Sequence, residues 1–130
     1  MTAPHSVVVV DDQAPFRQAA KAVLRRLTCF EFAGEASSGP EAIELVDALH
    51  PELVLMDINL PEMGGIEAAR RIVSAHPEVV VFLCSTYDVE DLPPGAAGSG
   101  ASAYVNKERF GAEVLRRLWA DRGEAPFPAA

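Results

Sequence analysis

The pattern of apolar and polar positions along the chain predicts alternating strands and helices. The continuous β-branched run at 7–10 is typical of a strand buried on both faces, and apolar residues then recur at helical spacing over 16–27. The same criteria predict further strands at 30–36, 52–56, 79–84 and 103–105, and further helices at 39–49, 66–75 and 108–122. This alternation predicts an α/β fold, in which helices cover both faces of a parallel sheet.

The segment between the last two predicted strands departs from this pattern. Five of the eight residues at 93–100 are Pro or Gly. In a helix interior, Pro costs about 3 kcal/mol and Gly about 1 kcal/mol relative to Ala. We therefore expect a short turn of helix at most in this segment. With no internal repeat or boundary in the sequence, we expect one domain over 1–122 and a flexible, frayed tail over 123–130.

The composition excludes several classes of protein. Eleven basic against nineteen acidic residues give a net charge of −8, whereas a dedicated nucleic-acid binder carries a basic surface. That charge does not favour an anionic membrane surface either. The apolar runs fall far short of the ~20 residues that span a bilayer, and the N-terminus lacks the features of a signal peptide. We expect a cytoplasmic protein that binds neither nucleic acid nor membrane directly.

Candidate chemistry lies at the carboxyl ends of the predicted strands, where doubly wound sheets bind their ligands. The polar residues that end these strands are Asp11, Asp12, Asp57, Ser85, Thr86 and Lys107. Three carboxylates at close range repel one another, and their oxygens suit a hard divalent cation, Mg²⁺ or Mn²⁺. A carboxylate beside such an ion can attack phosphorus, and a lysine and a hydroxyl can then bind the phosphoryl oxygens.

These residues, in this order, resemble the receiver domain of two-component response regulators. The resemblance covers residues 6 to about 121 and rests on the acidic pair after the first strand, on Asp-Ile-Asn-Leu-Pro-Glu-Met-Gly-Gly at 57–65, on Ser85 and on Tyr-Val-Asn-Lys at 104–107. It is closest in style to receivers that precede helix-turn-helix output domains. It implies a flavodoxin-like, CheY-like (βα)5 fold with strand order 2-1-3-4-5, here with a short or irregular fourth helix.

The resemblance also implies a phosphorylation site and a metal site. Asp57 would accept a phosphoryl group from the histidine of a sensor kinase or of a phosphotransfer protein. Asp12 would bind Mg²⁺ directly and Asp11 mainly through water. Asp57 itself and the backbone carbonyl of Asn59 would complete the protein ligands.

A second set of residues is implied to bind the phosphoryl group and to transmit its presence. Ser85 would move toward the phosphoryl oxygen, Lys107 would pair with Asp57 and then with the phosphate, and Tyr104 would turn inward as Ser85 moves. This coupling would alter the surface formed by the fourth helical segment, the fifth strand and the last helix. Thr86 stands where a smaller residue is common, and we hypothesise that it tunes the lifetime of the phosphoryl group.

The resemblance implies a signalling protein and leaves alternatives open. A receiver is a switch that at most catalyses its own phosphorylation and dephosphorylation, and its partners would be a kinase, a downstream protein or output domain outside this chain, and a second copy in a homodimer. Whether the chain stands alone or is a piece of a longer regulator stays open. A degenerate receiver that binds proteins independently of phosphorylation is one alternative. An aspartate-nucleophile phosphohydrolase is another, although Asn59 interrupts its Asp-x-Asp pattern.

Overall fold

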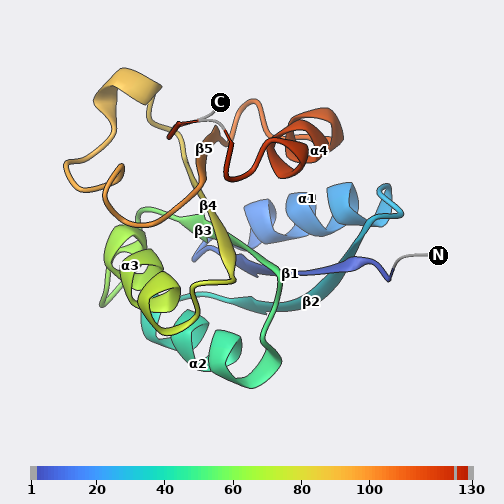
Figure 1. Cartoon of the computed structure of the whole chain (residues 1–130), viewed down its shortest axis with the longest axis horizontal. Coiled ribbons are helices and arrows are strands. Elements are labelled where there is room, and N and C mark those ends of the chain that lie inside the picture. Colours follow the sequence, from blue (N-terminus) through green and yellow to red (C-terminus); the bar gives the residue numbers. More distant parts are fainter. Residues whose placement is uncertain (1–2, 125, 129–130) are drawn as a thin grey trace.

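A computed structural model of the chain describes residues 3–124 and 126–128. The parts of the predicted domain and tail at 1–2, 125 and 129–130 lie outside the described residues. The predicted alternation of strands and helices is confirmed (Figure 1). In chain order the elements are β1 (His5–Val10), α1 (Ala14–Arg25), β2 (Phe30–Ala36), α2 (Gly39–Leu49), β3 (Leu53–Asp57), α3 (Gly65–Ala75), β4 (Val80–Ser85), the 3-10 turn η1 (Val89–Asp91), β5 (Ala103–Asn106) and α4 (Ala112–Ala120).

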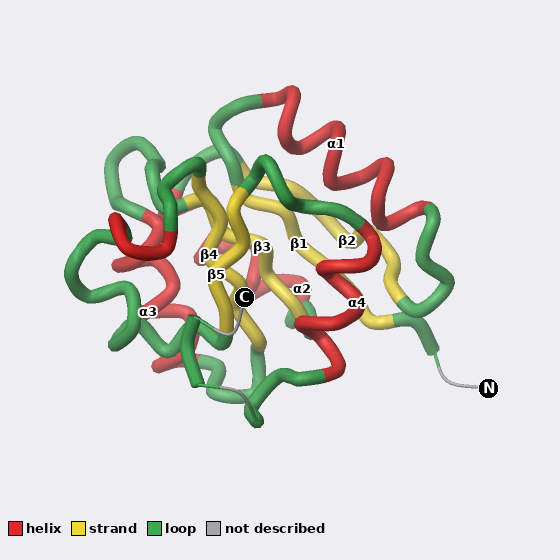
Figure 2. Tube along the Cα trace, turned by 90° about the horizontal axis from the view of Figure 1, so that it is seen from above, coloured by secondary structure: helices red, strands yellow, loops and turns green. Residues whose placement is uncertain are grey.

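The five strands form one parallel sheet in the order β2-β1-β3-β4-β5, which confirms the expected α/β fold. Figure 2 shows the sheet with helices on both faces. Alternate residues of each strand enter two separate apolar clusters, so that Val8 and Val10 pack toward α2 and α3 while Val7 and Val9 pack toward α1 and α4. Burial on both faces explains why the strands are continuous apolar runs.

The helix starts follow local rules of capping. α1 carries Pro15 in its first turn, where the missing N–H costs no hydrogen bond. At the start of α2, the Ser38 hydroxyl accepts from the Glu41 N–H at 3.3 Å, and the Glu41 carboxylate accepts from the Ser37 N–H at 2.6 Å. This reciprocal arrangement fixes where α2 begins. None of the described helices is both long enough and apolar enough to cross a membrane.

The connection from β4 to β5 contains only the turn η1, as its Pro and Gly content predicts. Ser99 holds the rest of this connection, because its hydroxyl donates to the Ala96 carbonyl at 2.7 Å and accepts from the Ala101 N–H at 3.2 Å. Gly100 has a φ of +91°, and a Cβ there would lie 2.9 Å from Val73 of α3. A compact loop of small residues therefore covers this end of the sheet.

The last helix is shorter than the sequence predicts, with α4 covering Ala112–Ala120 rather than 108–122. At its start, the Asn106 side chain accepts a hydrogen bond from the Glu108 N–H at 2.8 Å, which holds the chain in a turn after β5. Gly111 then precedes the helix in an extended conformation. Side-chain bonds of this kind compete with helix formation, which explains the late start.

The described part of the C-terminal tail contacts the domain, which differs from the frayed arrangement expected for 123–130. The Tyr104 N–H of β5 donates to the Pro128 carbonyl at 2.9 Å. The half-buried Phe127 packs against the apolar cluster on the α2–α3 face. Hydropathy did not reveal this contact because a single aromatic residue between two prolines carries no periodic signal.

The β3–α3 connection brings α3 unusually close to Asp57. Gly65 is the first residue of α3, and a Cβ at this position would lie 1.8 Å from the Asp57 carbonyl oxygen. The Gly65 N–H donates to the Ile58 carbonyl at 2.8 Å, so that the loop after Asp57 closes tightly. Only glycine fits this backbone contact.

We expect Gly65→Ala to lower the free energy of unfolding by about 2 kcal/mol or more, because the added methyl group meets backbone that cannot turn away. Gly98→Ala is the matched control, since the nearest atom to its new Cβ would be 4.0 Å away. We expect that control to change stability by less than about 0.5 kcal/mol. Urea denaturation followed by circular dichroism measures both, and equal effects would contradict the close approach at Gly65.

Candidate functional site

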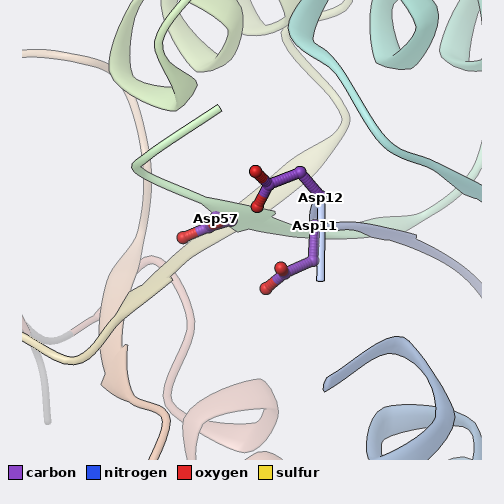
Figure 3. A group of neighbouring side chains, drawn as sticks. All are labelled: Asp11, Asp12 and Asp57. Atoms are coloured by element: carbon purple, nitrogen blue, oxygen red, sulfur yellow. The ribbon is translucent and has the colours of Figure 1, made fainter. Parts of the chain in front are cut away.

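Three carboxylates meet at the carboxyl ends of β1 and β3, as the sequence predicts. Asp11 and Asp12 follow β1 directly, and Asp57 is the last residue of β3. One oxygen of each lies within 4.8 Å of the others, and Figure 3 shows the three side chains gathered at the strand ends. Asp11 and Asp57 are buried, with exposed fractions of 0% and 3%, whereas Asp12 is exposed. Two buried carboxylates at this distance repel each other strongly.

Lys107, which follows β5, faces both buried carboxylates. Its Nζ lies 2.6 Å from Asp11 Oδ2 and 3.5 Å from Asp57 Oδ1. The Lys107 N–H donates to the Ser85 carbonyl at 2.8 Å, which ties the lysine backbone to β4. Burial lowers the pKa of Lys107, but the hydrogen bond to Asp11 and the charges of Asp57 and Asp11 outweigh it and raise the pKa overall. The lysine therefore stays protonated and supplies the positive charge beside the acids.

Asp57 holds its proton more tightly than an ordinary aspartate. Burial, together with the negative charge of Asp11, raises the pKa of Asp57 from 3.8 to about 6. The charge of Lys107 and a backbone hydrogen bond from Asn59, 3.3 Å from Asp57 Oδ1, act in the opposite direction and are outweighed. Near neutral pH the Asp57 carboxylate is ionised, and the charge of Lys107 and the hydrogen bond from Asn59 offset its burial only in part. Such a group is a candidate nucleophile or metal ligand.

The donor set of the three acids fits a hard divalent cation. Asp11 Oδ2 is fully buried, and among the described residues Lys107 is its partner, at 2.6 Å. Its other oxygen, Oδ1, accepts from the Gln13 N–H at 2.8 Å. All the candidate ligand atoms are oxygens, the type that Mg²⁺ and Mn²⁺ prefer. The participation of the Asn59 carbonyl stays a prediction.

Arg17 of α1 holds the backbone of the turn that carries Asp11 and Asp12, and the sequence interpretation missed this contact. Its Nη1 donates to the Asp11 carbonyl at 2.6 Å, and its Nε donates to Glu35 of β2 at 2.8 Å. Lys21 pairs with the same carboxylate. The hydrogen bond from Lys21, followed by that from Arg17, outweighs burial and lowers the pKa of Glu35. In the sequence, this contact was indicated only by a basic residue, Arg17, in the first turn of the helix that follows the acids.

Ser85 and Tyr104 are joined by hydrogen bonds at the ends of β4 and β5. The Tyr104 ring is completely buried, and its oxygen lies 2.7 Å from Ser85 Oγ. The phenol also lies 2.5 Å from the Tyr87 carbonyl and 3.0 Å from the Ser85 carbonyl. Because the phenol has one hydrogen and carbonyls only accept, Ser85 Oγ is the donor to Tyr104. Tyr104 is therefore already turned inward in this structure.

Tyr87 connects this pair to the loop after Asp57, and the sequence interpretation overlooked it. Its N–H donates to Ser85 Oγ at 3.2 Å, and its hydroxyl donates to Asn59 Oδ1 at 3.4 Å. Asn59 and Tyr87 each stand two residues after a strand end, which is the spacing that could have indicated the contact. Thr86 lies between Ser85 and Tyr87 and is exposed, so it borders the site without entering the core.

The raised pKa of Asp57 predicts how its replacement changes stability in metal-free buffer. A folded-state pKa above the usual value means that Asp57 stabilises the fold at low pH and that this contribution is lost as the pH rises through about 6. Asp57→Asn resembles the neutral acid and avoids this loss. We therefore expect the variant to exceed the parent in free energy of unfolding by about 1–3 kcal/mol at pH 7.5, and by much less at pH 4.5.

The measurement is urea denaturation of both proteins in EDTA across this pH range. Asp121→Asn serves as the control, because Asp121 is exposed beyond α4, and we expect it to change stability by less than about 0.5 kcal/mol at either pH. A stability difference between Asp57→Asn and the parent that stays constant with pH would contradict the buried, repelled carboxylate.

Comparisons with known proteins agree with this geometry. The family described as response regulator receiver domain matches residues 7–118. The transcriptional regulatory protein DegU of Brevibacillus brevis is 36% identical over 102 residues, covering 78% of this chain and 43% of that protein. The chemotaxis protein CheY of Thermotoga maritima is 36% identical over 112 residues, covering 86% of this chain and 92% of that protein.

A solved structure shows the same fold. The LuxR-family two-component response regulator from Aurantimonas sp. SI85-9A1 superposes with a TM-score of 0.82 at 28% identity, covering 97% of this chain and 93% of the other. The chain spans about half the length of several of the curated relatives that it matches. Since the family match covers nearly the whole chain, the chain belongs to the response regulator receiver domains.

Proposed function

We propose that this domain is the phosphoacceptor switch of a two-component system and that it takes a phosphoryl group onto Asp57. The observation that carries the proposal is the buried Asp57 carboxylate, held beside Asp11 and Asp12 and 3.5 Å from the Lys107 ammonium. A receiver domain signals and is not an enzyme in the ordinary sense. Any catalysis by this chain would concern the making and breaking of its own aspartyl phosphate.

In the proposed reaction, an Asp57 oxygen attacks the phosphorus of a phosphohistidine on a sensor kinase or a phosphotransfer protein. The new O–P bond forms as the P–N bond breaks, and the imidazole leaves with the electron pair of that bond and takes up a proton. Lys107 neutralises charge on the phosphoryl group, because its ammonium already lies between Asp11 and Asp57. The nucleophile needs no deprotonation above about pH 6.

The proposed metal site uses Asp11, Asp12, Asp57 and the Asn59 carbonyl. When bound there, Mg²⁺ or Mn²⁺ supplies positive charge to the phosphoryl oxygens. Asp12 suits a direct ligand because it is exposed at the mouth of the site, and the buried Asp11, whose Oδ2 already pairs with Lys107, suits a contact through water. Lys107 and the cation together would offset the two buried negative charges.

We further propose that Ser85 and Tyr104 transmit the phosphorylated state. The Ser85 hydroxyl lies next to Cys84, which is the residue paired with Asp57 across β3 and β4. The Ser85 hydroxyl can donate its hydrogen to a phosphoryl oxygen if its hydrogen bond to Tyr104 breaks. Such a change would reach a pocket of about 380 Å³ between η1, β5 and α4. This surface is where we place a downstream protein, an output domain or a second copy.

The remaining parts of the proposal rest on family membership, on the sequence pattern and on the net charge of −8. We place the switch in the cytoplasm, bounded at residues 1–122, without direct contact to membrane or nucleic acid. The degenerate receiver remains the second candidate, because the single turn η1 replaces a regular helix in the predicted signalling surface. The phosphohydrolase is disfavoured, because Asn59 stands where its second acid would be.

The direct test is incubation with Mg²⁺ and acetyl phosphate, followed by intact mass. We expect the parent to gain one phosphoryl group and Asp57→Asn to gain none, because the amide is not a nucleophile of comparable strength. Asp121→Asn is the control and should react like the parent, since this exposed carboxylate lies outside the site. Modification of Asp57→Asn to the same extent as the parent would contradict the assignment.

The same samples test the metal site. We expect millimolar Mg²⁺ to raise the melting temperature of the parent and of Asp121→Asn, because a ligand that binds only the folded state stabilises it. The rise should be much smaller for Asp12→Asn, which loses a ligand oxygen. An unchanged melting temperature for the parent, without any adduct, would favour the degenerate receiver. Sustained turnover of phosphomonoesters would favour the phosphohydrolase.

Thr86 gives a separate prediction about phosphoryl lifetime. Its exposed side chain borders the site between Ser85 and Tyr87, where it can limit the approach of water to Asp57. We expect Thr86→Ala to dephosphorylate several-fold faster than the parent, and Thr86→Ser to lie between the two. The loss of adduct with time by intact mass measures this, and identical rates for all three proteins would remove Thr86 from the mechanism.

A further inference from the structure

The outer edge of β5 contacts the C-terminal tail of the same chain. β5 is the last strand of the sheet, so only one of its edges pairs with β4. The Lys107 N–H points to β4, where it bonds to Ser85, and alternation along a strand places the Tyr104 N–H on the opposite edge. There the Tyr104 N–H donates to the Pro128 carbonyl at 2.9 Å. The tail thereby satisfies a donor at an otherwise open strand edge.

Phe127 fixes this contact on a particular face. α4 packs on the α1 side of the sheet, whereas Phe127 packs against the apolar cluster on the α2–α3 side. The chain therefore crosses the edge of the sheet after α4. The β4–β5 connection contributes only small side chains and prolines over 93–102. The Phe127 ring adds apolar cover on the face that this connection leaves thinly covered.

Tyr104 joins the tail to the phosphoacceptor site. Its backbone N–H bonds to Pro128, and its hydroxyl oxygen accepts from Ser85 Oγ at 2.7 Å. Its ring belongs to the same apolar cluster against which Phe127 packs. One residue thus contacts both the tail and the Ser85 hydroxyl, and a shift of its ring changes the support for both.

We propose that the outer edge of β5 is a docking edge for the C-terminal tail, that residues 126–128 occupy it, and that their docking is coupled through Tyr104 to the state of Asp57. This coupling rests on the proposed phosphoacceptor function. A phosphoryl group on Asp57 draws the Ser85 hydroxyl hydrogen away from Tyr104, and the phenol loses its donor. The contact between Tyr104 and the tail then weakens, and the outer edge of β5 becomes available to a partner strand.

Thermodynamic linkage makes the coupling reciprocal. If phosphorylation favours the undocked tail, then a variant with a weakened tail must favour phosphorylation to the same extent. Phe127→Ser removes the apolar contact and is the test variant. Phe127→Leu keeps an apolar side chain, and Pro126→Ala changes an exposed neighbour, so both serve as controls.

The experiment is amide hydrogen exchange of Tyr104 by NMR. We expect exchange in Phe127→Ser to be faster than in the parent by about 5-fold or more, and that in the two controls to stay within about 2-fold of the parent. The amides of β4 report whether the sheet remains intact. Beryllium fluoride with Mg²⁺, used as a phosphoryl mimic, should accelerate Tyr104 exchange in the parent, and the mimic should saturate Phe127→Ser at a lower concentration.

Three outcomes would overturn the docking proposal. Equal Tyr104 exchange in the parent and Phe127→Ser would show that the tail does not occupy the edge. Protection that rises with protein concentration would assign the edge to a second copy instead. Unchanged exchange in a parent that binds the mimic would remove the coupling while leaving the phosphoacceptor function intact. Failure of the parent to form any adduct would instead contradict that function, and the Phe127→Ser comparison would still decide the docking.

Discussion

Two buried carboxylates that share one ammonium are the constraint on which the rest of this domain depends. Asp11 and Asp57 are both shielded from water, and Lys107 lies between them at 2.6 and 3.5 Å. Separate charges of this kind would be costly to bury without such a partner. The ends of β1, β3 and β5 must therefore lie at the same level, and the register from β1 through β3 and β4 to β5 places them there. Two buried carboxylates against one ammonium leave the site with a net negative charge, which a divalent cation would offset.

The hydroxyl groups of Ser85, Tyr104 and Tyr87 form a second layer at the ends of β4 and β5. Ser85 follows the residue paired with Asp57, and Tyr104 is buried behind it. Each hydroxyl hydrogen of Ser85, Tyr104 and Tyr87 already takes part in a hydrogen bond. A new acceptor beside Ser85 must therefore displace an existing bond. The domain can therefore report a local change of charge without a large movement of its sheet. The tail at β5 is in contact with the last member of this layer.

Much of the fold could be predicted because its signals are local. The β-branched strands, the prolines at helix starts and the Pro-Gly stretch before β5 each act through neighbouring residues, and the acids gather because parallel strands end at one edge. The late start of α4 depends on the Asn106 side chain, which helical periodicity does not detect. Arg17, Tyr87 and Phe127 act across the fold, so their partners could not be identified before the chain was folded.

The missing side chain of Gly65 gives the site an asymmetry. Since α3 begins against the Asp57 carbonyl, the acceptor is braced from that side by backbone, which has almost no freedom to yield. The opposite side is made of a serine, two tyrosines and a loop of small residues, held by hydrogen bonds that can exchange partners. A change at Asp57 therefore meets rigid backbone on the α3 side and side chains that can rearrange on the other side. A change of charge at Asp57 would therefore displace the hydrogen-bonded side, toward β5, more readily than the backbone contact with α3.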